Sequence, residues 1–374
     1  MPKPMNHKVI AISVLRREKA QRDKLSGVLR FAADRSDWNV VIIEGKPVSS
    51  HHDAHICLYA APDDGKTNIP TVCVDAPPDY KPNHPHLHTD NVGIGKLAAN
   101  LFIRRGLCNF GAVLCIQPRQ RLHSVERIDG FRAQVRKAGY DVAVFEPQST
   151  EEDEFLPSSS RFGRWLSELP KPCGVLAFCD RSARDILDTC RLERIRIPEQ
   201  LMLIGVDNET DICEVTQPTL STIFPDFESA GYLAAQTLDR ILRGKPAKKN
   251  TVYAIKGLVE RDSTRPSSSA GRVVSSAQKL LSGARAPQTV AALAAALKLS
   301  VPTLNRSFRV VLGHGPKVEL CHQRLEQIKT LLRDRSLSIA EISNRCQFAY
   351  PENLHLFFRH HTGMTPTQWR QRDA

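Results

Sequence analysis

The chain has 374 residues, of which 41% are hydrophobic and 25% are charged, a composition typical of a soluble globular protein with two or three domains. Its formal net charge of +12 favours a polyanionic partner such as nucleic acid. None of its 10 cysteines has C-x-x-C spacing, and no apolar run reaches the ~18 residues of a membrane span. We therefore expect a cytoplasmic protein with reduced cysteines, and neither a disulfide scaffold nor a membrane protein.

In chain order, residues 1–262 alternate short apolar runs with helical patterns. Continuous apolar strands separated by helices predict an α/β fold with parallel sheets covered on both faces. Ligands bind at the carboxyl ends of such strands, so polar residues at those ends are candidate site residues. The predicted strands are 9–14, 40–43, 55–59, 71–74, 111–116, 141–145, 174–178 and 201–206, and the predicted helices are 25–33, 93–104, 125–138, 162–169, 182–192 and 227–242.

After residue 262 the pattern changes. Residues 263–271 are rich in Ser, Pro and Gly and are predicted to be a linker. Residues 272–374 then show only helical patterns and hold 15 Lys and Arg against 6 Asp and Glu, a net charge of +9. Because the rest of the chain carries only +3, the basic excess points to a nucleic-acid-binding domain in this last quarter, although a solvated basic surface would give the same count.

Two stretches of this domain, residues 289–309 and 338–359, share one layout. Each begins at a residue suited to an N-cap, Thr289 or Ser338, followed by a short helix, a tight break and a second helix. Pro302 and Pro351 lie in the first turns of the second helices, where a missing N–H is tolerated. This layout predicts two helix-turn-helix units, joined by a helix over roughly residues 316–333, whose second helices enter successive major grooves.

The segment resembles the AraC/XylS-type DNA-binding domain, because residues 313–316 (GHGP) and 361–370 (HTGMTPTQWR) match that family's motifs after each unit. It departs from the family at Gln347, where Gly is usual, at Lys298 and at Leu356. A generic helical bundle is the alternative. Arg pairs with guanine, Asn with adenine and Glu with cytosine, whereas Arg309 and Arg359 are better placed for phosphates. The resemblance implies that the DNA-contacting positions are Pro302, Asn305, Arg306, Arg309, Tyr350, Glu352, Asn353, His355 and Arg359.

Charged residues also mark the first domain. Asp180 and Asp207 each follow a predicted strand, and Arg127 begins a predicted helix. The stretches of sequence around these three residues resemble the two-lobed sensor domain of the LacI/periplasmic-binding-protein type. The resemblance implies that these three residues bind a small sugar between the lobes, because carboxylates accept and Arg donates several hydrogen bonds to hydroxyls. Asn208 adds an amide and Arg16 a further cation.

For Asp180 and Asp207 the alternative role is that of a helix N-cap. We prefer this role for Asp90, which precedes another predicted helix. The histidines at 51, 52, 55, 84, 86 and 88 lack metal-ligand spacing, so we expect no metal site, no cofactor and, in the absence of catalytic motifs, no enzyme.

The combined pattern predicts a sequence-specific DNA-binding transcription regulator. It is expected to be a homodimer that responds to a small sugar, with a pentose such as xylose as the first candidate, and to act with RNA polymerase in activating a pentose catabolic operon. One alternative is the same architecture with a degenerate sensor or a non-sugar effector. A sugar-binding transport protein is the other, but it has no use for a basic helix-turn-helix tail.

Overall fold

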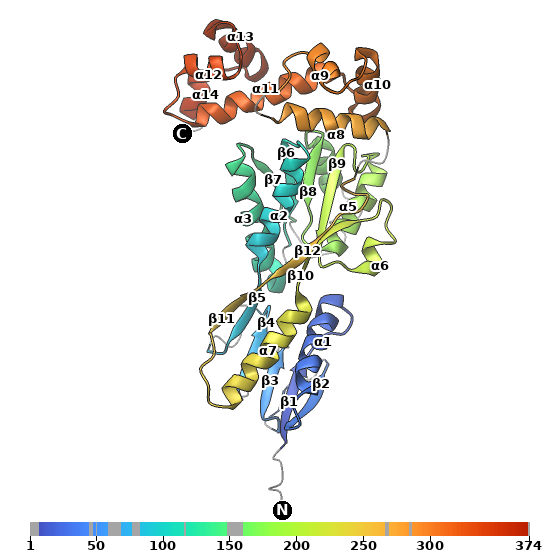
Figure 1. The fold of residues 1–374 in the computed structure, drawn as a ribbon, viewed down its shortest axis with the longest axis vertical. Coiled ribbons are helices and arrows are strands. Elements are labelled where there is room, and N and C mark those ends of the chain that lie inside the picture. Colours follow the sequence, from blue (N-terminus) through green and yellow to red (C-terminus); the bar gives the residue numbers. More distant parts are fainter. Residues whose placement is uncertain are drawn as a thin grey trace, which may run out of the picture.

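The computed structural model describes residues 7–44, 48–49, 51–58, 69–76, 83–115, 117–147, 160–265, 269–283 and 286–372. Two α/β lobes and an all-helical domain follow one another along the longest axis of the molecule (Figure 1). The expected fold class, a two-lobed parallel α/β domain followed by a double helix-turn-helix domain, is confirmed.

Lobe 1 is a six-stranded parallel sheet in the order β11-β5-β4-β3-β1-β2. Its core joins the apolar strands to the inner faces of two helices, and Ile10, Ile56 and Phe227 are buried there. Its elements are β1 (Lys8–Ser13), α1 (Lys19–Ala33), β2 (Trp38–Ile43), β3 (Ala54–Cys57), β4 (Thr71–Val74), β5 (His86–Thr89), α7 (Phe227–Leu242) and β11 (Asn250–Tyr253).

Lobe 2 is a six-stranded sheet in the order β12-β10-β9-β8-β6-β7, parallel except for β12, which pairs antiparallel with β10. Its elements are α2 (Asn91–Arg104), β6 (Asn109–Val113), α3 (Pro118–Lys137), β7 (Val142–Phe145), α4 (Ser160–Glu168), β8 (Cys173–Leu176), α5 (Asp180–Leu192), β9 (Leu201–Val206), α6 (Thr210–Cys213), β10 (Ser221–Pro225) and β12 (Ile255–Val259).

The chain passes between the lobes after β5, after β10 and between β11 and β12. Asp90 and Asp226 cap the helices that follow the first two crossings, accepting hydrogen bonds from the backbone N–H groups of Gly93 and Ser229. The N-cap expected at Asp90 is therefore confirmed. The strands on either side of the third crossing, β11 and β12, were not predicted. β11 is a short edge strand with an exposed Val252 side chain, so its sequence does not show the buried apolar run by which the other strands were recognised.

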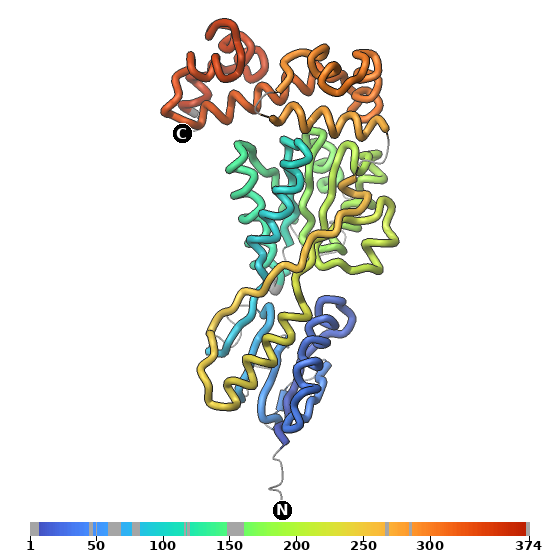
Figure 2. The backbone as a smooth tube through the Cα atoms, in the orientation of Figure 1, coloured from blue at the N-terminus to red at the C-terminus, as the bar shows by residue number. Residues whose placement is uncertain are grey.

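The helical domain contains two helix-turn-helix units joined by one long helix, α11, which Figure 2 traces from one unit to the other. The first unit also packs on α8, so that Ala277 and Leu281 share a core with Leu304 and Phe308. The elements are α8 (Ser269–Leu281), α9 (Val290–Ala296), α10 (Val301–Leu312), α11 (Pro316–Arg333), α12 (Ile339–Arg345), α13 (Pro351–Thr362) and α14 (Pro366–Arg372). None of the described helices is long and apolar enough to cross a bilayer.

The region expected to be a linker, residues 263–271, is ordered at both ends. Ser263 and Thr264 are fully buried, and the Ser263 hydroxyl donates to the carbonyl of Leu203 at 2.7 Å. At the other end α8 begins at Ser269. Residues 266–268 lie outside the described part of the chain. The reason for the difference is that small polar side chains suit both a linker and a buried sheet edge that is held by hydroxyl hydrogen bonds.

Candidate functional site

The loop after β9 holds Asp207 and Asn208 in an unusual backbone conformation. Their φ angles are 106° and 54°, values that L-residues rarely adopt and that cluster at ligand-binding sites. The backbone N–H of Asp207 donates to the carbonyl of Ile223, and that of Asn208 donates to the hydroxyl of Thr222 at 3.2 Å. These two hydrogen bonds fix the loop to the neighbouring strand β10. The Asp207 side chain lies half-buried at the carboxyl end of the sheet.

Asp180 lies beneath this loop. Its carboxylate accepts hydrogen bonds from the Thr222 hydroxyl at 2.7 Å and from the Glu209 backbone N–H at 2.8 Å, and the residue is 1% exposed. Burial, together with the nearby charge of Asp207, raises the pKa of Asp180 to about 8. Both of its oxygens are therefore used inside lobe 2, where they fix the loop that carries Asp207.

Arg127 projects from α3 and is also buried. Its Nε donates to the side-chain oxygen of Asn91 at 2.8 Å, one Nη donates to the carbonyl of Phe178, and the guanidinium lies 4.9 Å from the centre of the Phe178 ring. Burial raises the pKa of Asp207 to about 6, with Arg127 the strongest influence in the opposite direction. The two predicted residues Arg127 and Asp207 are thus electrostatic neighbours.

Lobe 1 presents a second charged group to this region. Asp75, directly after β4 with φ 52°, accepts from the ammonium of Lys24 at 2.5 Å and from the hydroxyl of Tyr253 at 2.5 Å. The hydroxyl and backbone N–H of Thr89 also donate to it. Burial alone would raise the pKa of Asp75, but Lys24, with help from His123 of lobe 2, holds it well below its usual range.

Charged groups of the two lobes lie close enough to influence one another's pKa. His123 on α3 influences Asp75 of lobe 1, and Lys24 of lobe 1 influences Asp207 of lobe 2. We call Lys24, Asp75, Arg127 and Asp207 the junction cluster. The remaining predicted residues lie differently: the side chain of Arg16 is exposed and paired with Glu44, and the amide oxygen of Asn208 accepts from Arg261 at 3.1 Å.

Sequence reasoning did not select Lys24, Asp75 or Tyr253. Asp75 carried the same signal as Asp180 and Asp207, because it directly follows a predicted strand. Tyr253 ends a strand that was not predicted, and Lys24 is a buried lysine on an amphipathic helix. For these two residues no local pattern separated them from ordinary surface positions.

The two expected reading helices expose the faces assigned to DNA. On α10, Pro302, Arg306 and Arg309 are exposed and Asn305 is half-buried, with its amide bonded to the carbonyl of Val301. Leu304 and Phe308 hold the opposite face in the core. On α13, Leu354 and Phe358 are buried in the same way. The residues of the second unit that remain accessible are Tyr350, Glu352, Asn353 and Arg359, together with the half-buried His355.

The backbone repeats between the two units. Lys298 and Gln347, in the turns before the reading helices, have φ values of 55° and 56°. Gly313 and Gly363, which end those helices, have φ values of 81° and 75°. Both turns therefore use the left-handed conformation that usually favours glycine, and the turn is intact in the second unit because Gln347 itself adopts this conformation.

Comparison with known proteins agrees with this geometry. Residues 99–264 match the periplasmic binding protein-like domain and residues 293–372 match a helix-turn-helix domain. The xylose operon regulatory protein of Haemophilus influenzae is 26% identical over 310 residues, which are 81% of this chain and 80% of that protein. The Escherichia coli protein of that name is 25% identical over 93% of both chains. A solved structure described as the xylose-binding transcription activator XylR covers 98% of both chains, with a TM-score of 0.64 and 23% identity.

The two-lobed domain and the paired reading helices define a transcription regulator in which a periplasmic-binding-protein-like sensor precedes an AraC-type DNA-binding domain. Within that class, the chain is homologous to the xylose operon regulatory proteins over nearly its whole length.

Proposed function

We propose that this protein is a cytoplasmic activator whose effector is a small neutral sugar bound at the junction cluster, with a pentose such as xylose as the first candidate. The arrangement of Arg127 and Asp207 on lobe 2 opposite Lys24 and Asp75 on lobe 1 carries the proposal. Sugar hydroxyls both donate and accept, so a site with carboxylates and cations on both sides suits them. The similarity to xylose operon regulatory proteins supports the choice of a pentose.

The proposed residues have different roles. Arg127 and Asp207 contact the sugar, while Asp180 acts as a positioning residue through the loop of Asp207, since both of its oxygens already accept hydrogen bonds. Asn208 positions the same loop through Arg261. The Arg16 side chain is exposed and forms an ion pair with Glu44, and this ion pair must break before Arg16 can contact a ligand.

The test is calorimetry of the full chain against a panel of pentoses and hexoses, followed by variants. Asp207→Ala removes an acceptor that can receive hydrogen bonds from hydroxyls, so we expect the sugar affinity to fall by about 1.5–3 kcal/mol, the usual scale for hydrogen bonds to charged groups. Asp207→Asn removes the negative charge but keeps a residue that tolerates positive φ. It therefore distinguishes the effect of the charge from an effect on the backbone conformation of the loop. Asp211→Ala, at an exposed position four residues further on, is the matched control.

Equal sugar affinity of wild type and Asp207→Ala would remove the junction cluster from consideration. A panel in which no sugar binds would instead support the alternative, a regulator with a degenerate sensor or a non-sugar effector. The buried Lys24–Asp75 pair favours that alternative, because these groups already satisfy each other without a ligand.

For the DNA-binding domain we propose that α10 and α13 lie in successive major grooves of one operator. Arg306 is proposed to bond a base edge, and Arg309 a phosphate. We further propose that the protein binds as a homodimer and contacts RNA polymerase, with the sensor ending at Thr264 and the DNA-binding domain starting at Ser269.

We expect Arg306→Ala and Arg309→Ala to differ in kind. Loss of a base contact relaxes sequence preference at one position, at a cost of ~1–3 kcal/mol, whereas loss of a phosphate contact weakens binding to all sequences and reduces its salt dependence. A binding-site selection with the full chain and with fragment 269–374 checks this. The assignment of Arg306 to a base and Arg309 to a phosphate fails if the two variants shift the preferred sequence in the same way. The proposal of sequence-specific DNA binding fails if neither the full chain nor the fragment selects any sequence.

A further inference from the structure

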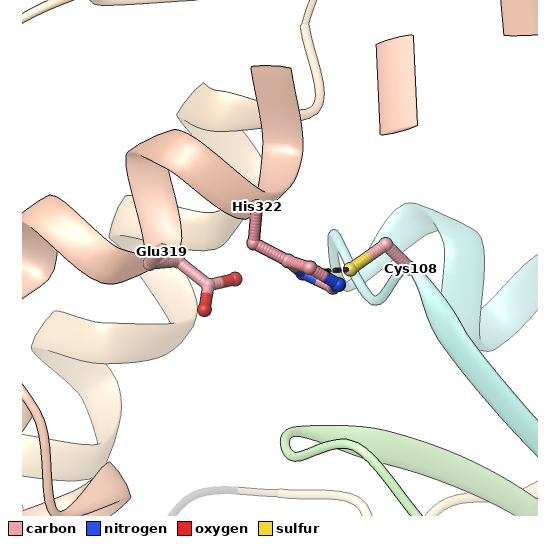
Figure 3. Close-up of side chains that lie close together, drawn as sticks. All are labelled: Cys108, Glu319 and His322. Atoms are coloured by element: carbon pink, nitrogen blue, oxygen red, sulfur yellow. Dashed lines mark hydrogen bonds between the residues drawn. The ribbon is translucent and has the colours of Figure 1, made fainter. Parts of the chain in front are cut away.

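A cluster of three different ligand types lies where the DNA-binding domain meets lobe 2. Cys108 precedes β6 of the sensor, whereas Glu319 and His322 are three residues apart on one face of α11. Their Sγ, carboxylate oxygen and ring nitrogen atoms all lie within 4.8 Å of one another. Figure 3 shows the His322 imidazole pointing at the Cys108 sulfur, with the Glu319 carboxylate on the other side of the imidazole.

The spacing of sulfur and nitrogen fits a metal. The Cys108 Sγ and His322 Nδ1 atoms are 3.6 Å apart. A tetrahedral zinc ion with bonds of ~2.3 Å to sulfur and ~2.0 Å to nitrogen sets these two ligand atoms about 3.5 Å apart. Glu319, whose carboxylate oxygen lies within 4.8 Å of both atoms, supplies the third ligand, and the fourth position is left for water.

The burial of the Glu319 carboxylate also favours a cation at this site. Glu319 is 2% exposed. A buried carboxylate normally has a cationic partner or a metal. The side-chain amide of Gln323 is 3.3 Å from both the Cys108 sulfur and a Glu319 oxygen, the position of an outer residue that orients metal ligands.

We propose that Cys108, Glu319 and His322 form a binding site for a thiophilic divalent cation, with zinc as the first candidate. Cobalt(II) can replace it as a probe. On binding, the thiol of Cys108 releases its proton to solvent and the neutral imidazole binds through Nδ1. Because the ligands come from two domains, the ion fixes the DNA-binding domain against lobe 2. No local pattern predicts this site, since Cys108 and His322 are 214 residues apart.

The test uses metal-free full-length protein titrated with cobalt(II), followed by competition with zinc. We expect one equivalent to bind with a thiolate-to-cobalt charge-transfer absorption, and zinc to abolish it. Cys108→Ser should remove this absorption, and His322→Gln should weaken cobalt binding at least tenfold. Cys321→Ser is the matched control, because Cys321 is the adjacent residue on α11 and is absent from the cluster.

His322 is only half-buried, so His322→Gln keeps the proposal testable if Cys108→Ser does not fold. The proposal is overturned if the wild type binds no stoichiometric cobalt, if Cys108→Ser keeps the charge-transfer band, or if Cys321→Ser loses it to the same extent. In those cases the three side chains are a hydrogen-bonded contact between the domains.

Discussion

At the scale of single residues, the sensor depends on carboxylates whose environments differ sharply. Asp75 has Lys24 as its partner and a lowered pKa, whereas burial raises the pKa of Asp180 to about 8 and that of Asp207 to about 6. The sequence showed all three as Asp after a strand. It did not show which of them has a cation beside it, because Lys24 reaches Asp75 from 51 positions away.

The raised pKa of Asp180 makes the stability of the sensor depend on pH. A group whose pKa is higher in the folded state gives stability that is fully present below its unfolded pKa, 3.8, and is lost as pH rises through about 8. We therefore expect the free energy of unfolding to decline between about pH 4 and 8. Asp180→Asn cannot ionise, so denaturant titrations should show a flatter decline for it, and parallel curves for variant and wild type would contradict this.

At the scale of elements, each lobe depends on one close helix pair. In lobe 1, Gly27 of α1 and Gly231 of α7 each contact the backbone of the other helix. In lobe 2, Gly95 of α2 and Gly130 of α3 do the same. A Cβ at Gly130 would lie 2.2 Å from the carbonyl oxygen of Val92, so the helices cannot pack this closely with any larger residue. The pair in lobe 2 also sets the distance between Asn91 and Arg127, and hence the position of the guanidinium.

We expect Gly130→Ala to lower the free energy of unfolding by about 2–3 kcal/mol, despite the higher helix propensity of Ala, because an overpacked contact forces the backbones apart. Sugar affinity should fall as well, since Arg127 moves with α3. The control is Gly257→Ala in β12, where a Cβ meets nothing closer than 3.5 Å. Denaturant unfolding of both variants measures the difference, and equal stabilities would count against the packing argument.

At the scale of the whole molecule, the fold class and the DNA-binding domain were largely predictable from the sequence. The joining helix was expected over roughly residues 316–333 and is observed at Pro316–Arg333, because Pro and the apolar spacing mark it locally. The junction cluster was only half predictable: Arg127 and Asp207 follow recognisable elements, but Lys24 and Tyr253 join them through tertiary packing. The docking of α11 on lobe 2 had no local signal at all.

That docking has a polar anchor at the end of α11. Arg333 donates to the carbonyl of Gly139 at 2.6 Å and to the carboxylate of Asp141 at 3.0 Å, and the Thr330 hydroxyl donates to the same carbonyl at 3.0 Å. These bonds tie the loop after α3, the helix that carries Arg127, to the DNA-binding domain. A change in lobe 2 can therefore reach the reading helices through this contact.

The double variant Thr330→Ala/Arg333→Ala removes all three bonds. The Arg333 side chain is 35% exposed, so we expect a loss of overall stability of no more than about 1–2 kcal/mol, but a clear loosening of the contact. Hydrogen exchange of the full chain should become faster in peptides covering residues 138–142 and 326–333, while the cores of both lobes stay protected. Arg335→Ala, which removes the same charge at an exposed position two residues away, should leave those peptides unchanged. If the double variant and this control exchange alike, the contact does not hold the two domains together, and the path from lobe 2 to the reading helices must run elsewhere.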